Sequence, residues 1–167
     1  MIQERLKALR AEMEKRGITV YVVPTADFHE SEYVGDHFKA RKFITGFTGS
    51  AGTAVITLEE AGLWTDGRYF VQAENQLKDS TVTLYRMGEE GVPTVDEFIK
   101  DKLKEGGCLG FDGRVVNGTW GGKLEKIAAE KNASMHVTED LIDLIWADRP
   151  ALSKQPLFIL EEKEYCG

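Results

Sequence analysis

The residues best suited to chemistry lie in the stretch 64–69, Trp-Thr-Asp-Gly-Arg-Tyr. Asp66 is expected to cap a following helix, so Arg68 falls in the first turn, where a cation opposes the helix dipole. Two interpretations of this unfavourable position stay open. In one, Arg68 only forms a surface ion pair with Asp66, which contributes little to stability. In the other, the guanidinium is held out to bind a carboxylate or carbonyl of a substrate, beside an aromatic wall.

A second polar group lies within six residues and consists of Asp27, His29, Glu30 and Glu32. These side chains are of the types that bind metals. On an extended segment, however, His29 shares a face with Asp27 and points away from Glu30. Two ligands are too few for a closed site, which needs about four. The pattern therefore predicts no metal site, and it favours either a polar turn or helix start, or a lining role at the rim of an active site.

A glycine-rich segment, Gly-Phe-Thr-Gly-Ser-Ala-Gly, occupies residues 46–52. Loops that bind phosphates leave a strand and enter a helix. Here a helix-like segment at about 36–45 comes first and a strand follows, which favours a tight turn and leaves nucleotide binding as the weaker alternative. Ser50 does not fit a nucleophile elbow, because Thr48 stands where the motif requires its first glycine.

The composition is that of a globular protein, and 167 residues suit one domain. Hydrophobic residues make up 42% of the chain and charged residues 29%. The 28 acidic and 21 basic residues give a formal net charge of −7. This balance argues against a general nucleic-acid binder, which would carry a basic stripe.

Cysteine content and hydropathy bear on the compartment. Cys108 and Cys166 have no paired spacing, which indicates a reducing environment. No apolar run approaches the ~20 residues of a membrane span, and the charged N-terminal segment lacks the apolar stretch of a signal peptide. We therefore expect a soluble, cytoplasmic chain with no membrane contact.

Hydrophobic periodicity predicts helices that alternate with strands after an initial hairpin. Helices are expected at 2–16, about 36–45, 67–77, 94–103, a segment through 124–128 that ends near 131, and a last segment through 141–145. Strands are expected at 18–23, 53–57, 63–65, 81–86, 108–111 and 134–137. The first strand is apolar throughout, which predicts burial on both faces, and the second and third should form the hairpin.

These elements predict an α/β fold, a single domain with a mixed β-sheet flanked by helices. The domain is expected to span residues 1–149. Residues 150–167 carry two prolines and an acidic run, and are expected to begin a linker to a following domain that this chain lacks.

Three blocks of sequence resemble the N-terminal domain of Xaa-Pro aminopeptidase, in the creatinase/prolidase family. They are PTADFHESEY at 24–33, FITGFTGSAGT at 43–53 and LWTDGRYF at 63–70. In addition, IWADRP at 145–150 resembles the end of that domain in the three-domain form of the enzyme. The blocks are long and in the family's order, and the resemblance covers essentially the whole chain.

The resemblance implies a domain that precedes a catalytic "pita-bread" domain with two divalent metal ions, usually manganese. That second domain supplies two Asp, one His and two Glu ligands and removes the N-terminal residue that precedes proline. It implies no catalytic residue and no metal ligand in this chain. It also implies a homodimer for the full-length enzyme, and an arginine near position 68 that reaches a peptide substrate. On this basis we expect Arg68, Asp66, Trp64 and His29 to face the substrate.

Three functions therefore compete. The first is the non-catalytic N-terminal domain of a metal-dependent Xaa-Pro aminopeptidase, which shapes the substrate cleft and subunit contacts. The second is a stand-alone peptide- or protein-binding module of the same superfamily without catalysis, for which an acidic surface suits basic partners. The third, a nucleotide-binding enzyme, depends only on the glycine-rich segment.

Overall fold

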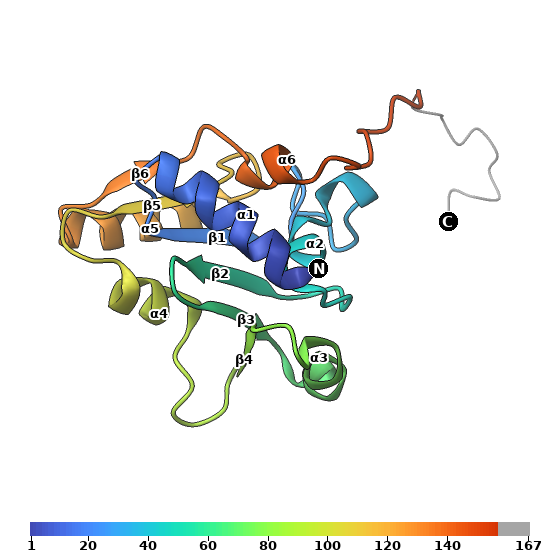
Figure 1. Ribbon diagram of the computed structural model, residues 1–167, viewed down its shortest axis with the longest axis horizontal. Coiled ribbons are helices and arrows are strands. Elements are labelled where there is room, and N and C mark those ends of the chain that lie inside the picture. Colours follow the sequence, from blue (N-terminus) through green and yellow to red (C-terminus); the bar gives the residue numbers. More distant parts are fainter. Residues whose placement is uncertain (157–167) are drawn as a thin grey trace, which may run out of the picture.

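A computed structural model describes residues 1–156 of the chain (Figure 1). Cys166 and the part of the predicted linker beyond residue 156 lie outside the described residues. Within residues 1–156, one six-stranded sheet runs in the order β4-β3-β2-β1-β5-β6. Its strands are β1 (Val20–Pro24), β2 (Thr53–Thr57), β3 (Ala61–Thr65), β4 (Thr83–Arg86), β5 (Cys108–Phe111) and β6 (Ser134–His136).

The sheet is mixed, as predicted. Strand β2 is antiparallel to both of its neighbours, β1 and β3, and forms the expected hairpin with β3. The other neighbouring pairs, β1 with β5, β3 with β4 and β5 with β6, are parallel. Five strands therefore run in one direction and β2 runs against them. Strand β3 begins two residues earlier than predicted, because Ala61 and Gly62 pair with Ile56 and Val55.

Helices cover both faces of the sheet. They are α1 (Ile2–Lys15), α2 (Ala40–Thr45), α3 (Phe70–Leu77), α4 (Val95–Lys102), α5 (Gly118–Glu130) and α6 (Leu141–Ile145). Two short 3₁₀ helices, η1 (Asp36–Phe38) and η2 (Gly67–Tyr69), precede α2 and α3. The predicted helix 67–77 is therefore a 3₁₀ turn followed by an α-helix. None of the described helices is long and apolar enough to cross a membrane.

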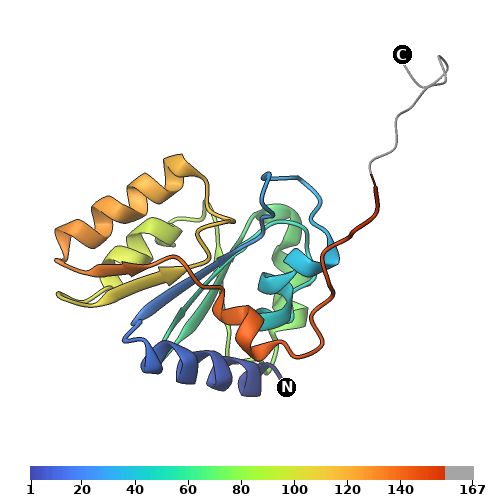
Figure 2. The same cartoon turned by 90° about the horizontal axis from the view of Figure 1, so that it is seen from above.

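The first face of the sheet is covered by α1, α2, α3 and α6 (Figure 2). The predicted stripe of α1 provides Leu6, Leu9 and Met13, which are each at most 1% exposed. Gly17, just after the helix, has a φ of +68°, the left-handed conformation that the sequence predicted there. The amphipathic pattern therefore fixed which side of α1 packs on the sheet.

The second face is covered by α4 and α5 (Figure 2). Strand β1 contributes to both faces, since Tyr21 lies in the first core and Val22 in the second. The whole strand is buried, as predicted. Helix α4 begins with the predicted capping box, in which Thr94 and Glu97 each accept a hydrogen bond from the other's backbone N–H.

The strand directions place three connecting segments at one edge of the sheet. Because β1, β3 and β5 run in the same direction, the segments that follow them leave from the carboxyl ends of neighbouring or near-neighbouring strands. These segments are residues 25–35, 66–69 and 112–117. Ligand sites of open α/β sheets form at this edge.

Candidate functional site

Arg68 and Asp66 form a two-point ion pair at the carboxyl end of β3. Arg68 Nε lies 2.8 Å from Asp66 Oδ1, and Nη2 lies 2.9 Å from Oδ2. The same Oδ1 accepts a hydrogen bond from the Arg68 backbone N–H, so Asp66 caps η2 as predicted. The ion pair lowers the pKa of Asp66 and raises that of Arg68. The Arg68 side chain is 71% exposed, so it lies at the surface with its charge paired.

The aromatic surface beside Arg68 comes from Tyr69, which the sequence analysis did not single out. The Arg68 guanidinium carbon lies 5.3 Å from the centre of the Tyr69 ring. The Tyr69 hydroxyl lies 2.6 Å from Ser50 Oγ, and its ring meets Phe47 edge-on at 5.9 Å. Tyr69 thus connects Arg68 to the glycine-rich segment. Its position directly after Arg68 was the available signal.

Trp64 lies in the second core and not on the surface beside Arg68. It is 0% exposed and stacks on Tyr85, with ring centres 4.1 Å apart, and its indole N–H donates to the Pro93 carbonyl over 2.8 Å. The reason is the alternation along β3, which turns Trp64 toward α4. The Trp64 ring is therefore part of the core and is not exposed beside Arg68.

The segment after β1 is a polar turn, one of the two expected interpretations. The Asp27 carboxylate accepts hydrogen bonds from the backbone N–H groups of Ser31, at 3.0 Å, and His29, at 2.8 Å. These bonds lower the pKa of Asp27 to about 2. His29 is exposed, and Glu32 on the same segment adds to the electrostatic stabilisation of the Arg68 cation. Within residues 1–156, no three His, Cys, Asp or Glu side chains converge on a possible metal position.

Arg41 holds the glycine-rich segment as the predicted tight turn, and sequence reasoning missed it. Only 3% of Arg41 is exposed, and its guanidinium donates to the carbonyls of Phe47, at 2.6 Å, and Gly49. Its Nε donates to Thr25 Oγ1 at 2.9 Å, which connects the turn to the end of β1. Burial lowers the pKa of Arg41 to about 10. The only sequence signal is an arginine beside the apolar residues of a short helix.

Gly49 is required by close packing at this turn. A Cβ atom there would lie 2.2 Å from Phe47 Cζ and 2.9 Å from Tyr69 Cδ1. The turn enters a strand, β2, and not a helix. The geometry therefore agrees with the tight turn expected from the sequence and lacks the helix N-terminus of a phosphate loop.

A second Asp-Gly-Arg sequence, Asp112 to Arg114, repeats the Arg68 arrangement at the end of β5. Arg114 Nε and Nη2 lie 2.9 and 3.0 Å from the two Asp112 carboxylate oxygens. Here the acid is buried, with 11% of its side chain exposed, against 37% for Asp66. The repeated Asp-Gly-Arg tripeptide is a signal in the sequence that the predictions above did not use.

Taken together, these residues form a polar edge that can bind and orient a ligand. It offers exposed guanidinium groups, an aromatic ring and hydroxyl groups. These groups suit the recognition of a peptide or an anion.

The chain is similar to one family over most of its length. The profile of the Creatinase/Prolidase N-terminal domain matches residues 5–145. Aminopeptidase P2 of Arabidopsis thaliana is 37% identical over 171 residues, an alignment that covers 100% of this chain and 24% of that protein. The probable Xaa-Pro aminopeptidase P of Neurospora crassa is 43% identical over 167 residues and is covered to 24%. The chain thus spans about a quarter of the length of the curated relatives it matches.

Solved structures agree with the sheet described above. The X-prolyl aminopeptidase of Caenorhabditis elegans, described as a cytosolic enzyme with a di-nuclear active site, matches with a TM-score of 0.88 at 33% identity. That match covers 96% of this chain and 28% of the enzyme. The N-terminal domain of peptidase PepQ from Mycobacterium tuberculosis matches with a TM-score of 0.59 at 23% identity, over 85% of this chain and 98% of that domain. The latter likeness is one of fold alone.

Proposed function

The chain belongs to the creatinase/prolidase N-terminal domain family, and on that premise we propose that it is the N-terminal domain of a metal-dependent Xaa-Pro aminopeptidase. The observation that carries this proposal is the extent of the match. Identity of 37–43% runs through almost all of this chain but through only 24% of the first two relatives. The conserved length is therefore that of one domain within a longer enzyme.

In this proposal the metal ions belong to a segment that the chain does not contain. Two divalent ions, which we propose to be manganese, would supply an activated water and polarise the scissile carbonyl. The described residues do not fit such a centre, because no three potential ligands converge among them. This chain's contribution is to bind and orient the peptide and to exclude water from one side of the cleft.

The peptide-facing residues in this proposal lie at the carboxyl edge of the sheet. Arg68, held by Asp66 and backed by Tyr69, would present a guanidinium to a carbonyl or carboxylate of the peptide. His29 is exposed on the neighbouring turn. Trp64 would act from the core, by holding β3 against α4.

We further propose the domain limits and partners of this enzyme. Residues 1–149 would form the domain and residues 150–167 would begin the linker, which is supported by the absence of helix or strand in 150–156. The partners would be a C-terminal catalytic domain of the same polypeptide, a peptide substrate and a second copy in a homodimer. A cytoplasmic location is supported by the cytosolic description of the Caenorhabditis elegans relative.

The test compares this chain with the longer polypeptide that the proposal requires, this domain followed by a catalytic domain. With Mn²⁺ and an Xaa-Pro tripeptide, the 167-residue chain alone should release no N-terminal residue, whereas the longer polypeptide should do so. Turnover by the short chain would refute the proposal that catalysis resides elsewhere.

A second candidate is a stand-alone module that binds a basic peptide or protein, which is favoured by the net charge of −7. The coding sequence after residue 167 separates the two. A continuing frame with two Asp, one His and two Glu in a catalytic domain supports the enzyme, whereas a stop codon supports the module.

A further inference from the structure

Arg41 is a buried cation whose hydrogen-bond partners are all neutral. It is 3% exposed, and within residues 1–156 its guanidinium donates to Thr25, Phe47 and Gly49 oxygens and to no carboxylate. Burying a charge is costly unless it is paired with an opposite charge. The interior beside Arg41 is therefore positive and suited to an anion.

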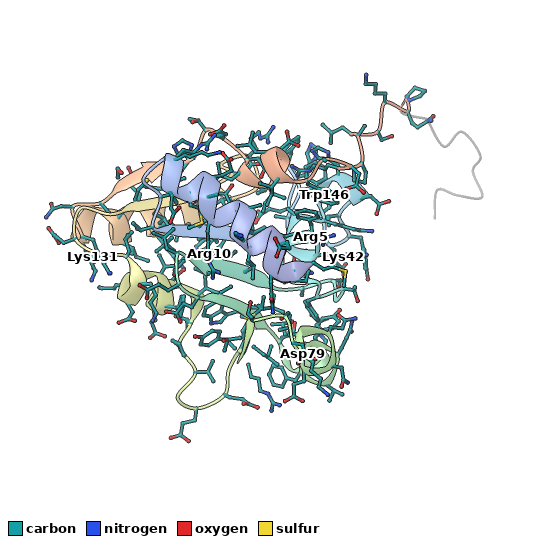
Figure 3. All side chains as sticks on the ribbon, viewed as in Figure 1. Arg5, Arg10, Lys42, Asp79, Lys131 and Trp146 are labelled. Atoms are coloured by element: carbon teal, nitrogen blue, oxygen red, sulfur yellow. The ribbon has the colours of Figure 1, made fainter. Side chains whose placement is uncertain are left out.

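A pocket of about 290 Å³ lies against Arg41, between the η1–α2 segment and the turn at residues 48–50. Lys39 and Lys42 of the same segment also line it, and Glu32 is its acidic residue. Lys39 already pairs with Asp36, but no ion pair of Lys42 occurs among the described residues. Figure 3 shows Lys42 at the edge of the molecule that also carries Arg5 and Trp146. The pocket is thus lined by more cations than anions in a chain of net negative charge.

The remaining walls of the pocket suit a short organic chain. Thr25, Thr48 and Ser50 line it with hydroxyl-bearing side chains. Tyr33, Val34 and Phe38 add apolar surface. This mixture fits a carboxylate attached to an apolar side chain better than an inorganic ion, which has no use for an apolar wall.

Two contacts connect a wall of the pocket to Arg68. Ser50 lines the pocket, and its hydroxyl contacts the Tyr69 hydroxyl at 2.6 Å. The Tyr69 ring in turn lies against the Arg68 guanidinium.

We propose that this pocket binds the C-terminal carboxylate of a short peptide. Lys42 makes the direct ion pair, and Arg41 adds positive charge from the floor of the pocket. The carboxylate is inferred from the pocket itself, whereas its origin in a peptide rests on the proposed function.

The first test is a titration of the ¹⁵N-labelled 167-residue chain, followed by NMR. The probes are Ala-Pro-Ala with a free C-terminus and the same tripeptide as its C-terminal amide. The free acid should shift the amide signals of Gly49 and Ser50 and bind about tenfold more tightly, the ratio that one charge-assisted hydrogen bond supplies. Equal affinity for acid and amide, or shifts confined to other regions, would overturn the proposal.

A matched pair of variants tests the role of Lys42. Lys42→Gln should weaken binding of the free acid by about tenfold and leave binding of the amide unchanged. Lys7→Gln removes an exposed charge from α1, away from the pocket, and should change neither. Lys42 is exposed, so its variant is expected to fold even if Arg41 variants lose the turn. Equal effects of the two variants would contradict a specific ion pair.

Inorganic phosphate identifies the other possible source of the anion. If phosphate shifts the amide signals of Gly49 and Ser50 and Ala-Pro-Ala does not, the pocket is a site for an inorganic anion. That result would overturn the peptide assignment. Failure of the proposed function is distinguishable, because binding is measured without catalysis. If the chain binds the free acid but the longer polypeptide cleaves no Xaa-Pro peptide, the carboxylate pocket is supported and the aminopeptidase function is refuted.

Discussion

Two arginines of this domain form ion pairs of the same geometry that differ in exposure to solvent. Arg68 and Arg114 each form the same two-point ion pair with an aspartate two residues earlier. The pairs differ in exposure, because the Asp112 side chain is 11% exposed and the Asp66 side chain 37%. An exposed pair adds little to stability, so the Asp66–Arg68 pair is free to exchange its partner for a ligand.

Replacing Arg68 tests whether its guanidinium faces the peptide. In the proposed full-length aminopeptidase, Arg68→Lys should lower kcat/KM for an Xaa-Pro peptide roughly tenfold, because lysine keeps the charge but loses the two-point geometry. The Tm should stay nearly unchanged, since the side chain is 71% exposed. Arg16→Lys is the matched control, because Arg16 forms a two-point pair with Glu139 away from this edge of the sheet, and it should leave kcat/KM unchanged. A parallel loss of Tm and activity would favour a purely structural role for Arg68.

The stabilisation of the turn after β1 by Asp27 should depend on pH in the acidic range. Asp27 has a pKa of about 2 instead of 3.8 because backbone N–H groups stabilise its charged form. The folded state therefore binds fewer protons than the unfolded state between these values, and stability is lost as the pH falls through this window. The Tm difference between the parent chain and Asp27→Ala should shrink from pH 4 to about pH 2. Asp148→Ala, at an exposed site, should show no such trend, and a constant difference for Asp27→Ala would contradict this account.

At the scale of elements, side-chain caps mark where four of the described helices begin. Asp66, Thr94, Asn117 and Asp140 each accept a hydrogen bond from a backbone N–H in the first turn of the helix that follows. These caps satisfy donors that have no partner within the helix. The Asp66 cap also places Arg68 in the first turn after β3.

The capping box of α4 gives a measurable contribution. Thr94→Ala should reduce the free energy of unfolding by about 1 kcal/mol. For a domain of this size, that loss lowers the Tm by roughly 2–4 °C, measured by calorimetry. Thr119→Ala lies in the first turn of α5, where Asn117 provides the cap, and should have a much smaller effect. Equal losses of unfolding free energy in the two variants would show that the Thr94 side chain does not stabilise the helix as a cap.

At the scale of the whole molecule, one sheet is shared by two cores. The first core packs α1, α2, α3 and α6 on one face, and the second packs α4 and α5 on the other. Strand β1 lies inside the sheet and is buried on both sides. Loss of either core therefore removes half of the packing around the same strand, which couples the two layers.

This coupling predicts one unfolding transition. Leu9→Ala on the first face and Ile99→Ala on the second each remove a side chain that is 0% exposed, at a cost of about 2–5 kcal/mol. Both should shift a single urea transition, with coincident midpoints for far-UV and near-UV circular dichroism. Leu144→Ala, at a side chain that is 50% exposed, is the control and should change stability by less than about 0.5 kcal/mol. Separate midpoints in Leu9→Ala would contradict the coupling.

The sequence by itself determined the features that depend on neighbouring residues. The α1 stripe, the left-handed Gly17, the caps of Asp66 and Thr94 and the strand Cys108–Phe111 were all predictable, because periodicity and capping act over a few residues. The mixed α/β sheet followed from the order of these elements, and the family followed from three long motifs.

Only the tertiary structure decided which side chains meet. It buried Trp64 under α4 instead of placing it beside Arg68, and it brought the Tyr69 hydroxyl to Ser50 of the glycine-rich turn. It also placed the Arg41 guanidinium in hydrogen-bond contact with the glycine-rich turn and left a pocket beside that cation. The physical reason is that these outcomes depend on the register and packing of strands far apart in the chain, and a local pattern does not specify which distant residue will fill a given space.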